Sequence, residues 1–324
     1  ERIGRLLPGE NFGMVDPERL WSHVERLAAE PRPAGSEVLE SCWVYVTEQL
    51  EAAGCRVERH PFAVEDNWGD WLEGVNLVAR WPARFDENAP RLLVGAHLDS
   101  LPQTPGADDN ASAVAALLEI ASCLDSEWPD DTVGVPVSLE LVAFDLEENG
   151  MLGGVARAAE LSRDGVDLFG MVSLEMLGYR DPTPGAQSLP RLLEGLYPDT
   201  GDFIAVIGNQ RSESLIELWA RGMREIEGLP VETLAVPENG EALQATRLSD
   251  HSPFWDAGFR ALMITDTSFM RNPHYHQPSD TPETLDPRFL AEVTRACLAA
   301  VSRVVTGVET GEENGDETGG VTGG

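Results

Sequence analysis

Residues 92–100, LLVGAHLDS, form an apolar run that ends abruptly in an imidazole and a carboxylate. The same design recurs in LELVAFDLEE at 139–148 and in GMVSLE at 170–175. Short apolar runs bounded by polar residues are typical of strands that are buried on both faces. We therefore expect three strands of one covered sheet, each with acidic or imidazole side chains at or just beyond its carboxyl end.

The segments around these runs alternate between helical and strand patterns. Helices are expected at 16–30, 36–54, 110–125, 152–163, 212–227 and 287–305, and further strands at 57, 74–80, 203–208, 231–236 and 260–265. This alternation predicts an α/β three-layer sandwich, with a mixed, largely parallel central sheet and helices on both faces. We expect residues 1–306 to form one domain, 181–201 to form a long loop, and the acidic, Gly-rich residues 307–324 to form a disordered tail.

The composition is strongly acidic. The 324 residues include 56 acidic side chains and 23 arginines but no lysine, for a net charge of −33. Such a charge repels nucleic-acid phosphates and anionic membranes, so we expect neither as a partner. No apolar run approaches the ~20 residues that span a bilayer, and no signal peptide is recognisable. The first residue is not Met, so a cytoplasmic location and secretion after processing both stay open.

The ends of the three strands carry a cluster of ionisable side chains. They are His97, Asp99, Glu147, Glu148 and Glu175. Ligands bind at the carboxyl ends of strands in α/β sheets, so we expect these side chains to meet at one rim. Carboxylates placed so close together repel one another unless a cation neutralises them, and a mixed set of histidine and carboxylate suits zinc.

Two other segments add candidate ligands. PGADDNAS at 105–112 runs into a helix, where Asp108 or Asp109 would either bind a cation or cap the helix. RNPHYHQPSDT at 271–281 contains two histidines on either side of a tyrosine, with an aspartate four residues after the second histidine. A pair of imidazoles in this setting is a further candidate for metal binding.

Taken together, these segments resemble the zinc exopeptidases of the M28 peptidase family. Five blocks in chain order carry the resemblance: HLDS at 97–100, PGADDNAS at 105–112, EENGMLGG at 147–154, SDHSPF at 249–254 and YHQPSDT at 275–281. The resemblance covers most of the chain, from residue 31 to residue 286. It implies an exopeptidase, most simply an aminopeptidase, that acts on peptides and binds two Zn²⁺ ions per chain.

The resemblance also assigns roles at matching positions. It implies that His97 and Glu175 bind one metal and that Glu148 and His276 bind the other, with Asp109 bridging the two. Glu147 would be the general base and Tyr275 the donor to the oxyanion. Supporting roles are implied for three carboxylates: Asp99, which would orient His97, and Asp250 and Asp280, which would contact metal-bound histidines.

The resemblance leads to expectations about three further features of the chain. It implies a cis peptide bond between Asp109 and Asn110. Many members have Asp where this chain has Glu175, so that this ligand would reach farther. We expect His251 to hold a loop, because the pair of Tyr275 and His276 already supplies the second imidazole.

Three alternative functions stay open at this point. Glutaminyl cyclases resemble the same fold but use one zinc and perform acyl transfer. A catalytically inactive binding module would have lost ligands, and none of the expected ligands is missing. A carboxypeptidase-like relative would have the same metal ligands, because these do not report which end of a peptide is recognised. The side-chain preference, the native metal and the oligomeric state are not readable from the sequence.

Overall fold

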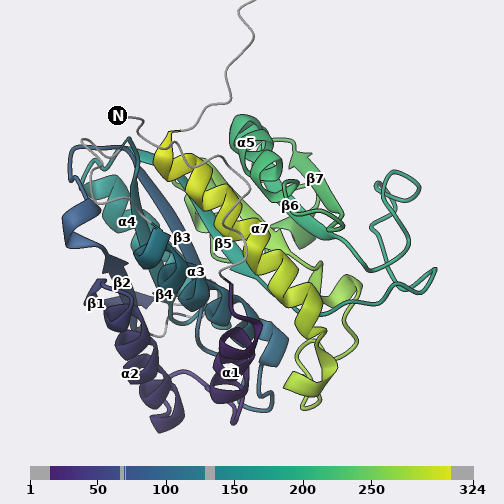
Figure 1. The fold of residues 1–324 in the computed structure, drawn as a ribbon, viewed down its shortest axis with the longest axis horizontal. Coiled ribbons are helices and arrows are strands. Elements are labelled where there is room, and N and C mark those ends of the chain that lie inside the picture. Colours follow the sequence, from purple (N-terminus) through teal and green to yellow (C-terminus); the bar gives the residue numbers. More distant parts are fainter. Residues whose placement is uncertain (1–14, 66–68, 70, 128–135, 308–324) are drawn as a thin grey trace, which may run out of the picture.

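The computed structural model describes residues 15–65, 69, 71–127 and 136–307, and its strands form one eight-stranded sheet (Figure 1). The order across the sheet is β1-β2-β4-β3-β5-β8-β6-β7. The strands are β1 (Arg56–Glu65), β2 (Trp71–Arg80), β3 (Arg91–His97), β4 (Ser138–Phe144), β5 (Leu168–Glu175), β6 (Ile204–Asn209), β7 (Val231–Val236) and β8 (Ala261–Thr265). The four neighbours β4, β3, β5 and β8 run parallel, while β2 and β6 run antiparallel to them.

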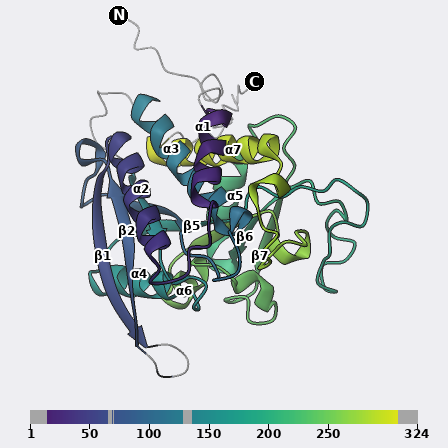
Figure 2. The ribbon, with the colours of Figure 1, turned by 90° about the horizontal axis from the view of Figure 1, so that it is seen from below.

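Helices cover both faces of this sheet, as Figures 1 and 2 show from two directions. One face carries α1 (Pro17–Leu27), α2 (Glu37–Ala52), α3 (Ala113–Glu127), α5 (Glu213–Met223) and α7 (Pro287–Thr306). The other face carries α4 (Leu152–Arg163) and α6 (His251–Asp256). The predicted three-layer α/β fold with a mixed, largely parallel sheet is therefore confirmed.

The central strands are continuous apolar runs because both of their faces are packed. All seven residues of β3 and all seven of β4 are buried. Leu92 and Val94 belong to the large core beneath α3 and α7, whereas Leu93 belongs to a smaller core on the side of α4 and α6. Alternate side chains of one strand thus pack into two different cores. Because a shift by one residue would move each side chain to the wrong core, this packing fixes the register between neighbouring strands.

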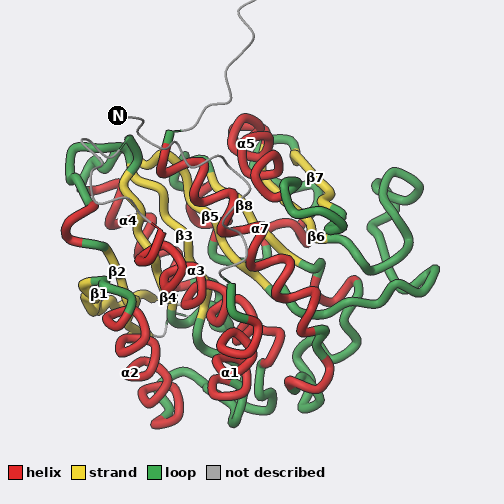
Figure 3. Tube along the Cα trace, viewed as in Figure 1, coloured by secondary structure: helices red, strands yellow, loops and turns green. Residues whose placement is uncertain are grey.

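The smaller layer is uneven. Helix α4 contacts β1 and β2, and α6 contacts β5 and β8. On the same face, β6 and β8 present a separate small cluster of apolar side chains: Phe203, Ala205, Ile207 and Met263. The long connection from β5 to β6, drawn in green at the right of Figure 3, includes the loop expected at 181–201. The face of β6 and β8 that carries this cluster therefore lies next to loops.

Some local expectations need correction. The short strand expected at 57 is the ten-residue strand β1, and it pairs along its whole length with β2. The six-residue helix α6 was not expected, because its residues HSPFWD are too few to show a helical period. The expectation of one domain over 1–306 stays a prediction, and the tail expected at 307–324 lies outside the described residues except for Gly307. Along the described chain, no helix combines the length and apolarity needed to cross a bilayer.

Candidate metal centre

The carboxyl ends of three neighbouring parallel strands meet at one rim of the sheet. His97 ends β3, and its register partner Phe144 ends β4, so the turn after β4 brings Glu147 and Glu148 close to His97. Glu175 ends β5 on the opposite side of β3. The order β4-β3-β5 explains why residues far apart in the sequence lie together.

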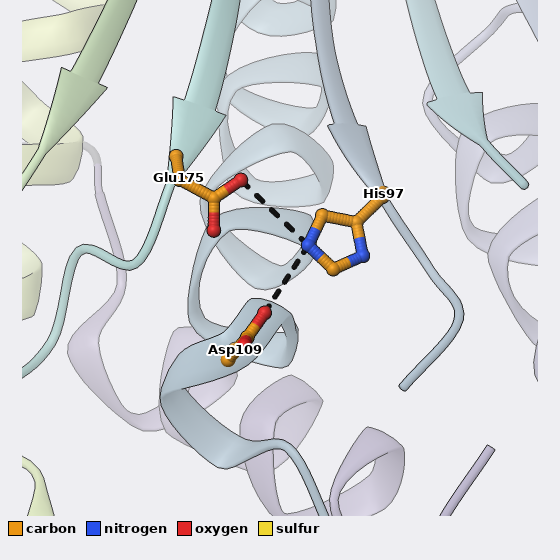
Figure 4. A group of neighbouring side chains, drawn as sticks. All are labelled: His97, Asp109 and Glu175. Atoms are coloured by element: carbon orange, nitrogen blue, oxygen red, sulfur yellow. Dashed lines mark ion pairs between the residues drawn. The ribbon is translucent and has the colours of Figure 1, made fainter. Parts of the chain in front are cut away.

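A first group of side chains surrounds the imidazole of His97, as Figure 4 shows. Its Nε2 lies 3.2 Å from Asp109 Oδ1 and 3.7 Å from Glu175 Oε2. All three residues are buried. They come from β3, β5 and the turn that enters α3, and their polar atoms converge on one point.

A second group shares Asp109 with the first. His276 Nε2 lies 3.1 Å from Asp109 Oδ2 and 3.2 Å from Glu148 Oε2. In each group, one candidate ligand atom per residue lies within 4.8 Å of the others. Each oxygen of Asp109 thus faces a different imidazole, which is the placement expected of a carboxylate that bridges two metal ions.

The electrostatics of these side chains fit a divalent cation. His97 Nε2 and Glu148 Oε1 are buried and have no hydrogen-bond partner among the described residues. Burial, reinforced by the charge of Asp109, raises the pKa of Glu148 to about 7. Burial likewise raises the pKa of Glu147 and of Glu175 above the usual range. Buried carboxylates that face each other need a positive charge, and nitrogen and oxygen ligands suit a metal ion.

Asp99 connects His97 to the turn after β4. Its two carboxylate oxygens accept hydrogen bonds from the backbone N–H groups of Glu147 and Glu148, at 3.2 and 3.1 Å. His97 Nδ1 lies 3.4 Å from Asp99 Oδ1 and 3.1 Å from the backbone oxygen of Asp99. The proton of Nδ1 is therefore directed to Asp99, which leaves Nε2 free as a candidate ligand atom.

The turn that carries Asp109 is tied to β5 through the next residue. The peptide bond between Asp109 and Asn110 is cis, as expected. Asn110 Nδ2 donates to the backbone oxygen of Leu174, and Asn110 Oδ1 accepts from the N–H of Met176. The side chain of Asn110 therefore fixes this turn next to the end of the strand that carries Glu175.

Two carboxylates that were predicted to contact the metal-bound histidines contact backbone N–H groups. Asp280 accepts hydrogen bonds from the backbone N–H groups of Asp108 and Asp109, at 2.9 and 3.2 Å, so it holds the bridging residue and not His276. Asp250 accepts from the N–H of Gly154 at 3.2 Å, and its other oxygen has no partner among the described residues. Sequence reasoning identified the carboxylates but not the backbone groups that they hold.

His251 lies apart from both groups. It is fully buried, its Nε2 lies 2.8 Å from the backbone oxygen of Thr246, and its ring packs edge-on against Trp255. Burial lowers its pKa to about 4, so the ring is neutral. The expectation that His251 holds a loop is confirmed.

Glu147 and Tyr275 line the cavity beside the two groups. Glu147 Oε2 lies 3.9 Å from His97 Nε2, and the ring of Tyr275 stacks on His276 with centroids 3.7 Å apart. Burial and the surrounding carboxylates raise the pKa of Tyr275 above its usual range. Its hydroxyl therefore keeps its proton and can donate a hydrogen bond into the cavity.

One contact was missed from the sequence. Ser249 Oγ donates to Glu175 Oε2 at 2.8 Å, and the hydroxyl of Ser173 lies 2.8 Å from Ser249 Oγ. Ser249 opens the block SDHSPF, but a serine between polar residues carries no pattern that distinguishes it from a loop serine. Only the meeting of β5 with the segment before α6 reveals that it positions Glu175.

Comparison with known proteins identifies relatives along most of the chain. The sequence profile of Peptidase family M28 matches residues 76–301. The uncharacterized protein YfbL of Escherichia coli strain K12 is 34% identical over 297 residues, covering 86% of this chain and 85% of that protein. A probable leucine aminopeptidase of Arthroderma benhamiae is 25% identical over 288 residues, covering 86% of this chain and 70% of that protein.

Solved structures share the fold. A zinc aminopeptidase from Bacillus subtilis superposes with a TM-score of 0.68 at 15% identity, over 90% of this chain and 96% of that chain. A glutaminyl cyclase of Porphyromonas gingivalis superposes with a TM-score of 0.67 at 19% identity, over 90% of this chain and 99% of that chain. At such low identity the likeness concerns the arrangement of helices and strands alone.

Proposed function

The chain belongs to peptidase family M28, and we propose that it is an aminopeptidase that binds two zinc ions and releases the N-terminal residue of peptides. The observation that carries this proposal is the pair of histidine–carboxylate groups that share Asp109 beside a cavity. The relative named a probable leucine aminopeptidase supports the reaction, and the Bacillus subtilis zinc aminopeptidase supports the metal. We further propose that residues 1–306 act as one domain.

Five residues would hold the metal ions. We assign His97 and Glu175 to one ion, Glu148 and His276 to the other, and Asp109 to both, following the two groups of converging atoms. Bound zinc supplies Lewis-acid chemistry, which polarises the peptide carbonyl and makes water acidic enough to attack near neutral pH.

Glu147 is the proposed general base. It lines the cavity next to the first group, and burial raises its pKa, which suits a group that must take up a proton and release it again. In the reaction, Glu147 accepts a proton from the attacking water and delivers it to the nitrogen of the departing amine. Asp99 holds the backbone N–H of Glu147 and so restricts where this carboxylate can lie.

Tyr275 is the proposed donor to the oxygen of the tetrahedral intermediate. Its hydroxyl stays protonated across the working pH range, and its ring is held by stacking on His276. A donor fixed before the reaction stabilises developing negative charge without further reorganisation.

A glutaminyl cyclase activity is the second candidate, because the Porphyromonas gingivalis enzyme shares the fold. The two complete ligand groups favour a peptidase, since a cyclase would use one zinc. The assay is a panel of aminoacyl p-nitroanilides, run after chelation and after zinc is restored, beside a peptide with N-terminal glutamine. We expect release of p-nitroaniline that depends on zinc. N-acetylated substrates serve as the control and should not be cleaved. Cyclisation of the glutamine peptide without hydrolysis of the panel would favour the cyclase instead.

A further inference from the structure

A cavity of about 250 Å³ extends from the metal centre over the end of the sheet formed by β8, β6 and β7. Glu175 and Glu147 line it at the end nearest the metal centre. Its floor is the face of β8, β6 and β7 that carries Phe203, Ala205 and Met263. The cavity is therefore continuous with the site where the peptide bond is cleaved.

The register of four strands places two carboxylates in one row along this floor. Glu175 pairs with Thr265, Thr265 with Ala205, and Ala205 with Glu232. Residues paired across neighbouring strands point to the same face of a sheet, and all four line the cavity. Three strand spacings separate the ends of the row, which is about 14 Å. The metal centre thus lies at one end of this row and Glu232 at the other.

Small side chains lie between these two ends. Thr265 and Ala205 form a trough, and the adjacent row of Met263, Ile207 and Leu234 forms an apolar wall beside it. Leu189 and Leu193 line the cavity from the loop, which makes the middle of the cavity apolar.

Glu232 is the polar end of this trough. It is half-buried, and no ion pair joins it to a described residue. None of the arginines in the described ranges lines the cavity, and Arg224 donates to the backbone oxygen of Val231 on the same strand without pairing with Glu232. Tyr197 donates to the backbone oxygen of Thr233, which fixes the loop next to Glu232. The carboxylate of Glu232 thus lies in a partly closed pocket to which the described residues contribute no cation.

We propose that this trough binds the side chain of the substrate's N-terminal residue and that Glu232 selects arginine or lysine at this position. The inference rests on the proposed aminopeptidase activity and deepens it. With bonds of ~1.5 Å in a zigzag, an extended arginine side chain reaches about 6 Å from its Cα. This reach is close to half of the ~14 Å row, so a substrate whose Cα lies over the middle of the row, next to the metal centre, places its cation near Glu232. The methylene groups then lie on the apolar wall, and the cation meets the carboxylate.

The test compares substrates that differ in the charge at the end of the side chain, and one pair, arginine and citrulline, has nearly the same shape. kcat/KM is measured with the zinc-loaded enzyme for arginine and citrulline p-nitroanilides, and for lysine and norleucine p-nitroanilides. We expect the charged member of each pair to be favoured roughly tenfold, because a charge-assisted hydrogen bond is lost with the neutral one. In Glu232→Gln the arginine-to-citrulline ratio should fall to about one, while turnover of the citrulline substrate reports that the variant is folded.

Glu194→Gln is the matched control, because Glu194 is exposed on the loop over the cavity but does not line it. It removes the same charge from the same surface and should keep the wild-type ratio. Equal rates for arginine and citrulline in the wild type would overturn the inference, as would a ratio that survives Glu232→Gln or falls equally in Glu194→Gln. Hydrolysis of no aminoacyl substrate at all would instead contradict the proposed function.

Discussion

The two ends of strand β4 carry buried glutamates in opposite electrostatic settings. Near its start, Glu140 is fully buried and forms ion pairs with Arg80 at 2.7 Å, Arg91 at 3.3 Å and Arg157. Beyond its end, Glu147 and Glu148 line a cavity that no arginine lines. Burial alone raises the pKa of Glu140, but the three guanidinium groups outweigh it and hold that pKa below its ordinary value. Burial raises the pKa of Glu147 and Glu148, and the nearby imidazoles of His97 and His276 offset this rise only in part.

This difference in charged partners separates carboxylates that stabilise the fold from carboxylates that are candidates for binding a ligand. A buried charge is tolerated when partners surround it, and removing the partner is costly. The fold directs three of the chain's 23 arginines to Glu140. At the other end of the strand the neighbouring basic groups are the imidazoles of His97 and His276, and they offset only part of the effect of burial on the carboxylates. A metal ion bound between these side chains would supply the remaining positive charge. The ion pairs of Glu140 thus stabilise the fold, whereas Glu147 and Glu148 lie beside the candidate metal centre.

The largest expected effect is on turnover. Glu147→Gln should lower kcat by ~10²–10⁴-fold, because a glutamine has the same shape but cannot accept a proton. Bound zinc, measured on the purified protein by elemental analysis, should stay at the wild-type amount, since Glu147 is not an assigned ligand. Near-normal turnover in this variant would show that the base is another residue.

The next effect is on stability, at the opposite end of β4. Glu140→Gln should reduce the free energy of unfolding by about 3–5 kcal/mol, because it leaves buried guanidinium groups without their carboxylate. Urea denaturation of the metal-free protein measures this change. The matched substitution Glu147→Gln removes one of several repelling carboxylates and should not destabilise the metal-free protein. A loss of stability as large in Glu147→Gln as in Glu140→Gln would abolish the distinction between the two ends.

Metal binding should stabilise the fold through the side chains beyond the carboxyl end of β4 and not through Glu140. Adding zinc at 100–1,000 times its dissociation constant should raise the free energy of unfolding by about 2.7–4.1 kcal/mol. Asp109→Asn should lose most of this gain, because both candidate groups share that carboxylate. Glu140→Gln should keep the gain while starting from a lower stability. A gain that is unaffected by Asp109→Asn would place the bound zinc elsewhere.

The smallest expected effect separates the two metal groups from each other. Glu175 carries one methylene more than an aspartate would, and Ser249 holds one of its oxygens. We expect the group of His97 and Glu175 to bind zinc more weakly than the group of Glu148 and His276, roughly tenfold or about 1.4 kcal/mol. Calorimetric titration of the metal-free protein should resolve two steps, and Glu175→Asp should bring them closer. Two equal sites that do not change in Glu175→Asp would contradict this expectation.

Much of the site was predictable because its signals are local. An apolar run that ends in His97, or in Glu175, shows both a strand and the polar group at its carboxyl end. Parallel strands place such ends at one rim whatever the details of packing, so the gathering of His97, Glu148 and Glu175 follows from the pattern, whereas the roles of Asp109 and His276 were implied by the resemblance to the M28 family. The large elements follow for the same reason, since periodicity over ten or more residues is a property of the segment itself.

By itself, the sequence determined the fold class, the order of the long helices and strands, and the strand-end residues that gather at the rim. The tertiary structure decided which buried carboxylates receive cations from the protein, because Glu140 lies in an ordinary strand pattern and its arginines come from β2, β3 and α4. It also decided that Glu232 lies in line with Glu175, since that alignment depends on the registers of four strands joined by loops and helices. Register and ion pairing are set by packing between distant segments, and no local pattern encodes them.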